Sequence, residues 1–506
     1  MVRRPALPGT LHAAFRIGRP ADTWYVSALS AVVAMGVPDA ALLAAGRLDL
    51  ALYTSAGALC ALYGHDRGYA ARARTLALVV LGMTAGVGAA LGAASLTRSP
   101  AVLVLVAAVL AAAQKTVCDA SRTGPPGSII LTFVTSSACF VPQRAADLPF
   151  HLSLTLACGL WAWLVCMAPG LVRPHGPERR AAARALEAAA RAVRADGPDA
   201  PRARHAAWQA LLRAPAGIRA HVHRGLAHAE PDAGHWEAWA RDLRAGRRAL
   251  PGGTGAALSG RPPLPRLLPA GARVLVGSAL AGWAALACGV GHPYWAVVTA
   301  ASVVQASTAL SWHRALQRVS GNLLGVLLFA ALVPVIRTGA VAMVLAALAL
   351  QAGAEALISR NYWLGTVCVT PMALLLTEFG GSRPAGELVG DRWTDTLVGA
   401  ATGLLVCALV TDRRAADRVE AAVVRVDGAL AAALAVPAGA HPARETARDR
   451  LAAALVDLRE AADTAAGEWR QRGLPGERVA RAERDGHRAL ASLVREHAPA
   501  GGPAPA

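Results

Sequence analysis

Two arginines stand between apolar segments in the stretch HPYWAVVTAASVVQASTALSWHRALQRVSGNLLGVLLFAAL, which covers residues 292–332. Arg314 and Arg318 lie in its short basic segment, beside Trp312 and His313. The planar guanidinium group of arginine donates paired hydrogen bonds to carboxylates, so both side chains are candidates for binding an organic anion. A phospholipid headgroup or a carboxylate of the protein itself is the alternative partner.

Neutral polar side chains in the same stretch could complete such a site. Thr299 and Gln305 belong to the first apolar run, and Asn322 directly follows Gly321 in the second. An anion that leaves water needs polar groups that replace its hydration. The predicted substrate-binding residues are therefore Arg314, Arg318, Gln305, Thr299 and Asn322.

Proton-driven transport requires a titratable group within the membrane, and Glu355 in LALQAGAEALISR is the candidate. An ion pair with Arg360 or a place at the membrane interface is the alternative for this residue. Asp39, Asp391 and Asp395 stand at segment ends, where an interfacial position is expected. Pro371 interrupts an apolar run and indicates either an unwound segment with free carbonyl groups or a simple kink.

The chemistry of common enzymes is not indicated by the sequence. There is no Walker A motif, no Ser/His/Asp set and no group of metal ligands at characteristic spacing, so we expect neither an enzyme nor a cofactor or metal site. His221, His223 and His228 are close in sequence but are expected on a solvated helix face. The eight cysteines form no CxxC pair and are interpreted as small core residues.

Composition places these residues in a membrane protein. Of the 506 residues 55% are apolar, and the mean hydropathy is +0.39. Apolar runs long enough to cross ~30 Å of hydrocarbon recur along the chain, and in lipid such runs must be helical. The net charge of +18 lies in loops and in two polar blocks beside the apolar runs, which favours a membrane surface over nucleic acid as its partner. The predicted fold is therefore all-α and polytopic.

About twelve transmembrane helices are expected in two groups of six. The first group is predicted at 23–45, 48–63, 75–95, 100–117, 128–142 and 148–169. The second group is predicted at 271–291, 293–308, 318–336, 339–357, 361–379 and 392–411.

Charged, alanine-rich blocks separate and follow the two groups. The predicted domains are a leader at 1–22, a first bundle at 23–169, a helical region with a Gly/Pro-rich linker at 170–268, a second bundle at 269–411, and a C-terminal helical region with a disordered tail at 412–506. Arginines concentrate in the leader and in the loops on one side, which is therefore expected to be cytoplasmic. Both termini and both helical regions are then cytoplasmic, and apolar stripes on those helices suggest a homo-oligomer.

The two groups share an order of features that predicts an internal repeat. In each, a short apolar run and a basic segment precede a run with glycines four residues apart, Gly82 and Gly86 in the first group and Gly321 and Gly325 in the second. Small residues at this spacing allow close helix packing in lipid. Because each group has six runs, the repeats are predicted to be parallel, related by an axis along the membrane normal.

The second group resembles the fusaric acid resistance (FUSC) family, which includes bacterial aromatic acid exporters. Tyr294 and Trp295 at the start of one run, followed by Arg314, Arg318 and the two glycines, are similar to the family pattern over about 45 residues. The arrangement of six spans, helical block, six spans and tail matches over nearly the whole chain. The first group lacks the Tyr-Trp entry, and its glycines follow the arginines at a greater distance.

This resemblance implies an inner-membrane exporter of small organic acids, including aromatic ones, driven by the proton gradient. Plant malate channels are distantly similar, so a passive anion channel is an alternative. A membrane scaffold that acts through its helical blocks is a third hypothesis. The expected partners are the lipid bilayer and a small organic anion.

Overall fold

The structure is a computed structural model of the chain. It describes residues 14–18, 24–124, 126–197, 200–227, 232–251, 267–378, 385–410, 415–437, 440–468 and 476–495. The tail and most of the linker lie outside these ranges. Every regular element in them is a helix, as the sequence predicts.

Contacts divide the chain into two compact units, each built from separated parts of the sequence. The membrane unit comprises 1–65, 70–172 and 261–411. The helical unit comprises 66–69, 173–260 and 412–506. Both predicted bundles thus fall within one unit, and both charged blocks fall within the other.

The described helices of the membrane unit follow the predicted segments. In the first half they are α2 (Trp24–Ala45), α3 (Ala51–Ala58) flanked by short 3₁₀ turns, α4 (Tyr69–Leu96), α5 (Pro100–Ala120), α6 (Ile129–Ala138) and α7 (Leu148–Val172). In the second half they are α12 (Leu268–Ala287), α13 (Tyr294–Val303), α14 (Thr308–Ile336), α15 (Ala340–Ile358), α16 (Tyr362–Glu378) and α17 (Ala385–Leu409). Pro371 lies inside α16, which continues through it as a helix.

These segments are not twelve equal spans. Within the described residues, seven helical segments are long and apolar enough to cross a membrane, namely those containing α2, α4, α5, α7, α12, α14 and α15. The apolar segments at 48–62, 129–138, 294–303 and 362–376 are shorter. A ten-residue helix rises only ~15 Å, half of a hydrocarbon core, so α6 and α13 do not span it alone. The short segments are the second and fifth of each half.

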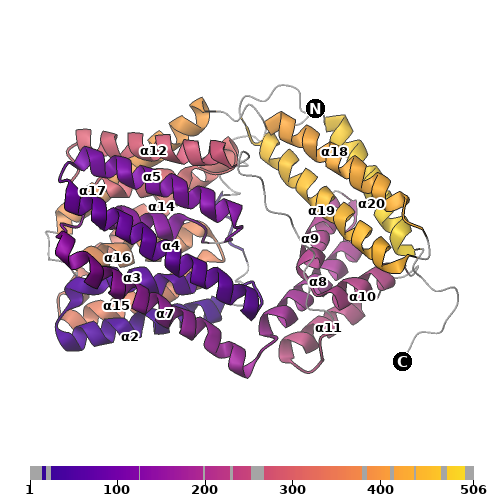
Figure 1. Ribbon diagram of the computed structural model, residues 1–506, viewed down its shortest axis with the longest axis horizontal. Coiled ribbons are helices and arrows are strands. Elements are labelled where there is room, and N and C mark those ends of the chain that lie inside the picture. The colour runs from indigo at the N-terminus through magenta and orange to yellow at the C-terminus, as the bar shows by residue number, and fades with distance from the viewer. Residues whose placement is uncertain are drawn as a thin grey trace. The chain divides into compact units, whose positions relative to one another are not determined.

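Packing between helices repeats from one half to the other (Figure 1). The second helix packs on the sixth in both halves, α3 on α7 and α13 on α17. The halves also exchange equivalent contacts, because α5 packs on α12 while α15 packs on α2. This reciprocity is what a two-fold relation between parallel repeats would produce.

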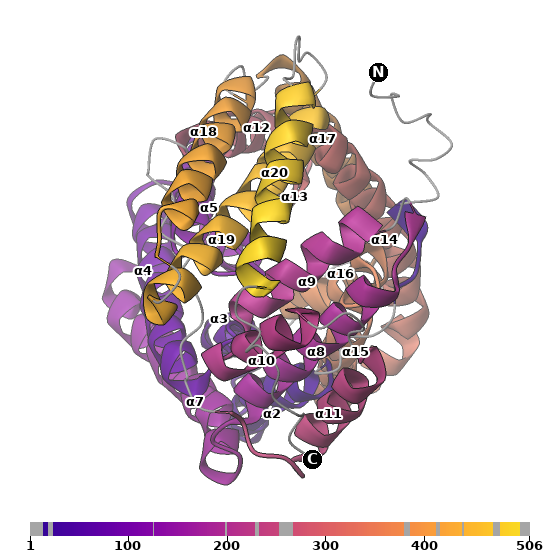
Figure 2. The same ribbon diagram turned by 90° about the vertical axis from the view of Figure 1, so that its right-hand side faces the viewer.

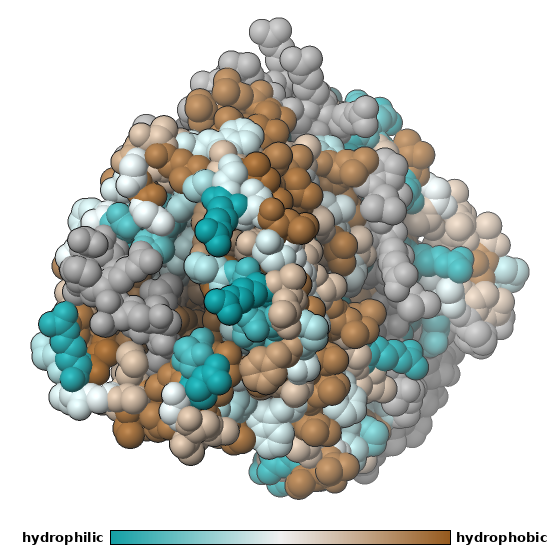
Figure 3. Space-filling view, turned by 60° about the vertical axis from the view of Figure 1, so that its left-hand side comes forward, coloured by the Kyte–Doolittle hydropathy of each residue, from teal (hydrophilic) through white to brown (hydrophobic). Residues whose placement is uncertain are grey.

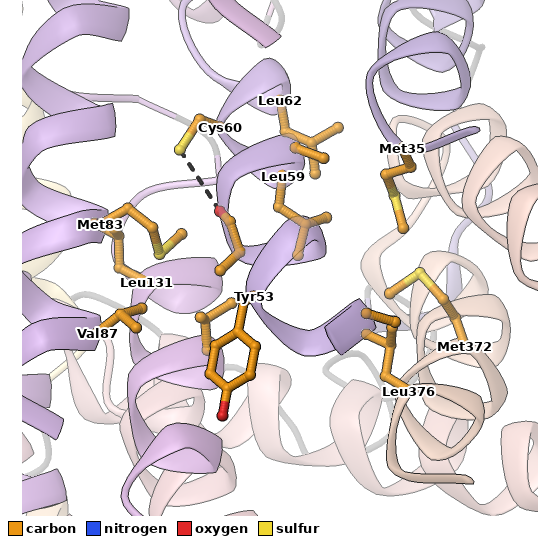
Figure 4. Packing of buried hydrophobic residues seen from close by; sticks show 14 of the residues in the cluster. Met35, Tyr53, Leu59, Cys60, Leu62, Met83, Val87, Leu131, Met372 and Leu376 are labelled. Carbon is orange, nitrogen blue, oxygen red and sulfur yellow. Dashed lines mark hydrogen bonds between the residues drawn. The ribbon is translucent and has the colours of Figure 1, made fainter. Parts of the chain in front are cut away.

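The core of the membrane unit is made of small and flexible apolar side chains from both halves. Figure 4 shows Met35 of α2 facing Met372 and Leu376 of α16, with Leu59 beside them. All eight cysteines are free and seven are buried, Cys288 being exposed. Cys60 and its neighbours therefore act as small core residues that let helices approach closely.

Large apolar side chains also remain on the outside of this unit. Leu96 and Leu171 are about nine-tenths exposed, and Leu78, Leu29 and Leu345 more than half. Brown, apolar surface covers much of the face in Figure 3. Water would not favour such a surface, whereas lipid does, so the exposed residues agree with membrane embedding.

The helical unit contains two apolar clusters. One joins α8 (Gly176–Arg194), α9 (Ala200–Arg213), α10 (Ala216–Ala227) and α11 (Ala233–Ala245). The other joins α18 (Ala415–Leu434), α19 (His441–Ala466) and α20 (Gly476–Arg495), which pack on one another (Figure 2). Leu451, Leu455 and Leu458 are buried on one face of α19, as their spacing indicates.

The histidines of α10 correct one expectation. His223 is buried, and its ring centroid lies 5.3 Å from that of Trp208. His221 packs edge-on against Trp239 with ring centroids 4.4 Å apart, and His228 lies outside the described residues. A solvated helix face is therefore wrong for His221 and His223, because their rings pack against tryptophans. No group of three metal-ligating side chains occurs in the described part of the chain.

Candidate functional site

A break between α13 and α14 forms the basic segment. Residues 304–307 leave the helical conformation, and Ser307 caps α14 by accepting a hydrogen bond from the backbone N–H of Leu310 at 3.4 Å. The Gln305 amide donates to the carbonyl oxygens of Ser302 and Val304 at 2.9 and 3.2 Å. The Gln305 side chain thus donates hydrogen bonds to carbonyl oxygens at the C-terminal end of α13 in this structure.

Glycines bring α14 against α16. A Cβ at Gly321 would lie 2.6 Å from the Thr366 Cβ, and one at Gly325 would lie 2.7 Å from the Thr370 Cβ. Real Cβ atoms do not approach this closely, so both positions require glycine for this packing. Polar groups of the two helices consequently meet deep in the bundle.

A second pair of glycines brings α17 against α13. A Cβ at Gly399 would lie 2.7 Å from the Ala296 carbonyl oxygen, and one at Gly403 would lie 3.3 Å from the Ala300 Cα. The GAATG sequence at 399–403 carries the same four-residue spacing as the predicted pair, and could have been recognised by it.

The corresponding pair in the first half differs. A Cβ at Gly86 would lie 2.8 Å from the Thr135 Cγ2, which is again a close approach. Nothing described lies within 4 Å of a Cβ at Gly82, so the helix packing predicted there is not found. Gly82 is exposed on the surface of α4, away from α6.

Three neutral polar residues meet at the midpoints of their helices. The Asn322 amide of α14 donates to the Thr396 hydroxyl of α17 at 2.9 Å and accepts from the Thr370 hydroxyl of α16 at 2.6 Å. Thr396 in turn donates to the carbonyl oxygen of Arg392 at 2.7 Å. These buried bonds connect α14, α16 and α17 about halfway along each helix.

Arg314 and Arg318 converge on Tyr362 at the start of α16. Arg318, only 5% exposed, donates to the Tyr362 hydroxyl at 3.0 Å. The guanidinium carbon of Arg314 lies 3.9 Å from the centroid of the Tyr362 ring. This face-on contact stabilises a cation without an acidic partner.

Arg392 is the largest fully buried side chain of the described residues. Its guanidinium carbon lies 3.8 Å from the centroid of the Trp295 ring, which itself stacks on Phe133 of α6 at 5.3 Å. The Nε and Nη1 atoms of Arg392 have no hydrogen-bond partner among the described residues, and neither has Nε of Arg318. Arginine N–H groups in such surroundings are strong donors that lack an acceptor.

Asp395 lies one turn further along α17 and is completely buried. Neither of its carboxylate oxygens has a hydrogen-bond partner within the described ranges. Arg392 lies close enough to both Asp395 and Arg318 for their charges to interact. The buried Thr299 hydroxyl of α13 likewise lacks a partner there and packs against Gly399, one turn beyond Asp395.

Comparison with known proteins finds a likeness for this half of the membrane unit. Residues 280–406 match the family model described as fusaric acid resistance protein-like. Over 190 residues the chain is also 35% identical to a Bacillus subtilis protein described as uncharacterized membrane protein YvaC, an alignment covering 37% of this chain and 29% of that protein. No solved structure matches the chain.

We call one set of buried polar residues the buried cluster. They are Thr299, Arg318, Asn322, Thr370, Arg392, Asp395 and Thr396, and all lie in the fusaric acid resistance-like segment. Arg318, Asn322 and Thr299, all predicted from sequence, lie in or beside it, whereas Gln305 and Arg314 lie nearer the break between α13 and α14. Glu355 lies elsewhere, half-buried on α15, a helix that packs on α2 and α16. No ion pair between Glu355 and Arg360 occurs in the described structure.

Arg392 and Asp395 are the residues that the sequence reasoning missed. The segment DRWTD begins the last predicted span, and its acidic residues were expected at the interface. Asp391 does remain half-exposed, where its carboxylate lies 3.1 Å from the His292 ring nitrogen. Asp395 and Asp39 are instead buried, because α17 continues outward to Ala385 and α2 continues through Pro38.

The cluster resembles an anion site in charge as well as in geometry. Two buried arginines lie near one another with one buried acid, Asp395, beside them, and no described carboxylate lies within ion-pair distance of either arginine. Buried charge that is only partly compensated is costly, by up to several kcal/mol even after relaxation. An anion that accepts from the open N–H groups of Arg318 and Arg392 would remove that cost.

Proposed function

We propose that this protein transports small organic anions across the cytoplasmic membrane, with aromatic carboxylates among its substrates, in the direction of export. The observation that carries the proposal is the pair of buried arginines, Arg318 and Arg392, whose open N–H groups lie inside a fusaric acid resistance-like segment. A carboxylate suits these donors because it offers two acceptor oxygens to each guanidinium fork.

Aromatic side chains around the arginines favour a substrate with a planar apolar part. Trp295 lies against Arg392, Tyr362 against Arg314 and Arg318, and Tyr294 next to Trp295 with ring centroids 5.0 Å apart. A benzoate-like ring could pack on such rings while its carboxylate meets the guanidinium groups. Asn322 and Thr299 would form hydrogen bonds with the substrate as neutral groups. Gln305 would do so only after its amide leaves the carbonyl oxygens at the end of α13.

The structure holds the cluster closed. Arg392, Asp395, Asn322 and Thr299 are each at most 2% exposed. Transport therefore requires a rearrangement that opens the contacts of α17 with α13 and α14. The short helix α13 is suited to such a movement, because residues 304–307 already interrupt the backbone next to it.

Proton coupling of the export is part of the proposal. Glu355 and Asp395 are the buried or half-buried acids of the second half that make no ion pair in the described structure. Asp395 lies beside the arginines, so its protonation would directly change their affinity for an anion. Under the positive-inside rule, the arginine-rich loops support a cytoplasmic position for both termini in this proposal.

The test is flux of labelled benzoate and of labelled malate in proteoliposomes containing the full chain, with and without a pH gradient. Arg392→Gln removes the N–H groups that have no described acceptor. Arg337→Gln removes an exposed arginine of the same half and is the matched control. We expect flux to fall at least tenfold in the first variant and to persist in the second. Melting temperature and monodispersity establish that both variants are folded.

Two outcomes would replace the proposal. Flux that is lost with Arg392→Gln but indifferent to the pH gradient would make the protein a passive anion channel. No anion flux by folded protein would favour a membrane scaffold that acts through its helical unit. In that case the buried arginines would have a purely structural role.

A further inference from the structure

An arginine-lined groove lies in the helical unit, between the parts of the chain that build it. It has a volume of about 850 Å³ and is formed by α9 from the middle block and by α19 and α20 from the C-terminal block. We define the arginine groove by its charged lining residues. These are Arg202, Arg204, Arg459, Arg484, Arg488, Asp463 and Glu483.

The charges of this groove do not cancel. Both acids that line it are engaged by Arg459, whose side chain lies 3.3 Å from the Asp463 carboxylate and 3.5 Å from that of Glu483. Arg488 pairs with Asp485, beside the groove, at 3.3 Å. With Asp485 counted, five arginines face three acids, an excess of two positive charges with the histidines neutral. Arg204 and Arg484 contribute to this excess.

Arg204 and Arg484 illustrate the surplus on two different helices. Among the described residues, the hydrogen bond of Arg204 is a long one, 3.4 Å, from its Nε to the Ala200 carbonyl oxygen one turn away on α9. No ion pair of Arg484 on α20 occurs within the described ranges, and its side chain is exposed. Like charges from different helices converge here, so folding has placed them together against their mutual repulsion.

We infer that the arginine groove binds a small anion carrying at least two negative charges, a chemistry shared by a nucleoside triphosphate and a tricarboxylate. The volume lies within the range of about 300–1,000 Å³ that is usual for small-ligand sites. Guanidinium forks match phosphate and carboxylate groups alike. Apolar lining from Pro201, Leu455, Ala480 and Ala491 leaves room for an uncharged part of the ligand.

The ligand would connect two blocks that are far apart in sequence. Polar contacts already join them, among them the Gln209 amide with the Glu460 carboxylate at 3.0 Å and Arg219 with Asp449 at 3.1 Å. An anion held by Arg204 on one block and Arg484 on the other adds a bridge. Since it binds only the folded unit, it should raise the melting temperature of that unit. The inference does not depend on transport by the membrane unit.

The experiment measures binding of ATP and of citrate by calorimetry to the full chain in nanodiscs of neutral lipid. Arg204→Gln is the test variant, and Arg425→Gln is its matched control. Arg425 is an exposed helix arginine that also donates to the carbonyl oxygen four residues before it, but it lies outside the groove. We expect affinity for the bound anion to fall about tenfold in the test variant and to stay unchanged in the control. Arg484→Gln repeats the test at an exposed position if Arg204→Gln fails to fold.

Binding of either anion supports the inference, and the ratio of the two affinities identifies the source. The inference is overturned if neither binds at millimolar concentration, or if Arg425→Gln weakens binding equally. It is also overturned if nanodiscs of anionic lipid abolish ATP binding because headgroups occupy the groove, or if affinity for RNA rises with its length. Either result would assign the arginines to a macromolecular or membrane surface.

A histidine inside the groove gives an independent readout. Burial, together with the positive charges of Arg204 and His205, lowers the pKa of His487 to about 4. A bound anion favours the protonated ring, so ligand should raise this pKa, which NMR of the histidine ring measures. An unchanged pKa at saturation would contradict binding in the groove. The charged and titratable groups that line the groove with His487 are Arg202, Arg204, His205, Arg459, Asp463, Glu483, Arg484 and Arg488.

Discussion

The two halves of the membrane unit bury similar residue types but treat them differently. In the first half, Arg72 donates to the Cys166 carbonyl oxygen at 3.3 Å and contacts the His65 ring nitrogen at 2.9 Å. In the second half, Arg392 lies on Trp295 and keeps two nitrogen atoms without described acceptors. Arg72 joins its helix to neighbouring segments through hydrogen bonds. Arg392 instead has N–H donors in the interior that no described residue accepts.

The neutral polar clusters show how the halves are alike. Gln114 exchanges hydrogen bonds with Thr132 and Thr135 at 3.1 to 3.2 Å, much as Asn322 does with Thr370 and Thr396. Both clusters fasten helices through side chains, and a close glycine stands beside each. Beside the second cluster, Arg318, Arg392 and Asp395 have nitrogen or oxygen atoms without hydrogen-bond partners among the described residues. From this difference we propose that the first half supports the fold and that the second half binds the anion.

The largest expected effect comes from exchanging the two arginines for glutamine. Arg392→Gln should lower anion flux by about tenfold to a hundredfold, because charge-assisted hydrogen bonds contribute ~1.5–3 kcal/mol. Its melting temperature should change little, because removing a buried, partly compensated charge offsets the loss of the contact with Trp295. Arg72→Gln should instead destabilise the fold by ~1–3 kcal/mol with flux per folded protein preserved. An equal loss of flux in both variants would contradict the proposal that Arg392 binds the anion and that Arg72 only stabilises the fold.

The buried acids offer the next comparison. Asp395→Asn should abolish the effect of a pH gradient on anion accumulation, which for one coupled proton per anion is about tenfold per pH unit at equilibrium. Glu355→Gln tests the group expected from sequence, and Asp39→Asn tests a buried acid of the first half. We expect Asp39→Asn to retain the response. If Asp39→Asn alone removed it, the coupling group would lie in the half that we regard as a support.

Glycine substitutions compare the halves through stability. Gly325→Ala places a Cβ 2.7 Å from the Thr370 Cβ and 3.0 Å from the Val367 carbonyl oxygen, so α14 and α16 must separate. A cost of ~1–3 kcal/mol is expected in equilibrium unfolding in detergent. Gly82→Ala meets nothing described within 4 Å and should be neutral or slightly stabilising. Equal costs at both positions would mean that α4 is packed at Gly82 in the membrane.

Sequence reasoning found the helices because a membrane imposes length and polarity on each segment. It could not tell a ten-residue helix such as α13 from a full span. The predicted segment at 293–308 included residues 304–307, where the backbone leaves the helix. It identified Arg318 and Asn322 because they are polar residues at the start of an apolar run. It missed Arg392 and Asp395 because charged residues near a loop read as interfacial until the packing of α17 buries them.

The smallest effects should come from the neutral clusters, and they separate support from binding most finely. Asn322→Ala and Gln114→Ala each remove a hydrogen-bonding side chain between helices, at a similar cost of about 1 kcal/mol in unfolding free energy. Only Asn322→Ala should also raise the KM for anion flux, because Asn322 lies beside the arginines and Gln114 does not. Matched losses of stability with a shift in KM confined to Asn322→Ala would locate binding in the second half. A shift of the same size in Gln114→Ala would mean that both halves line one path.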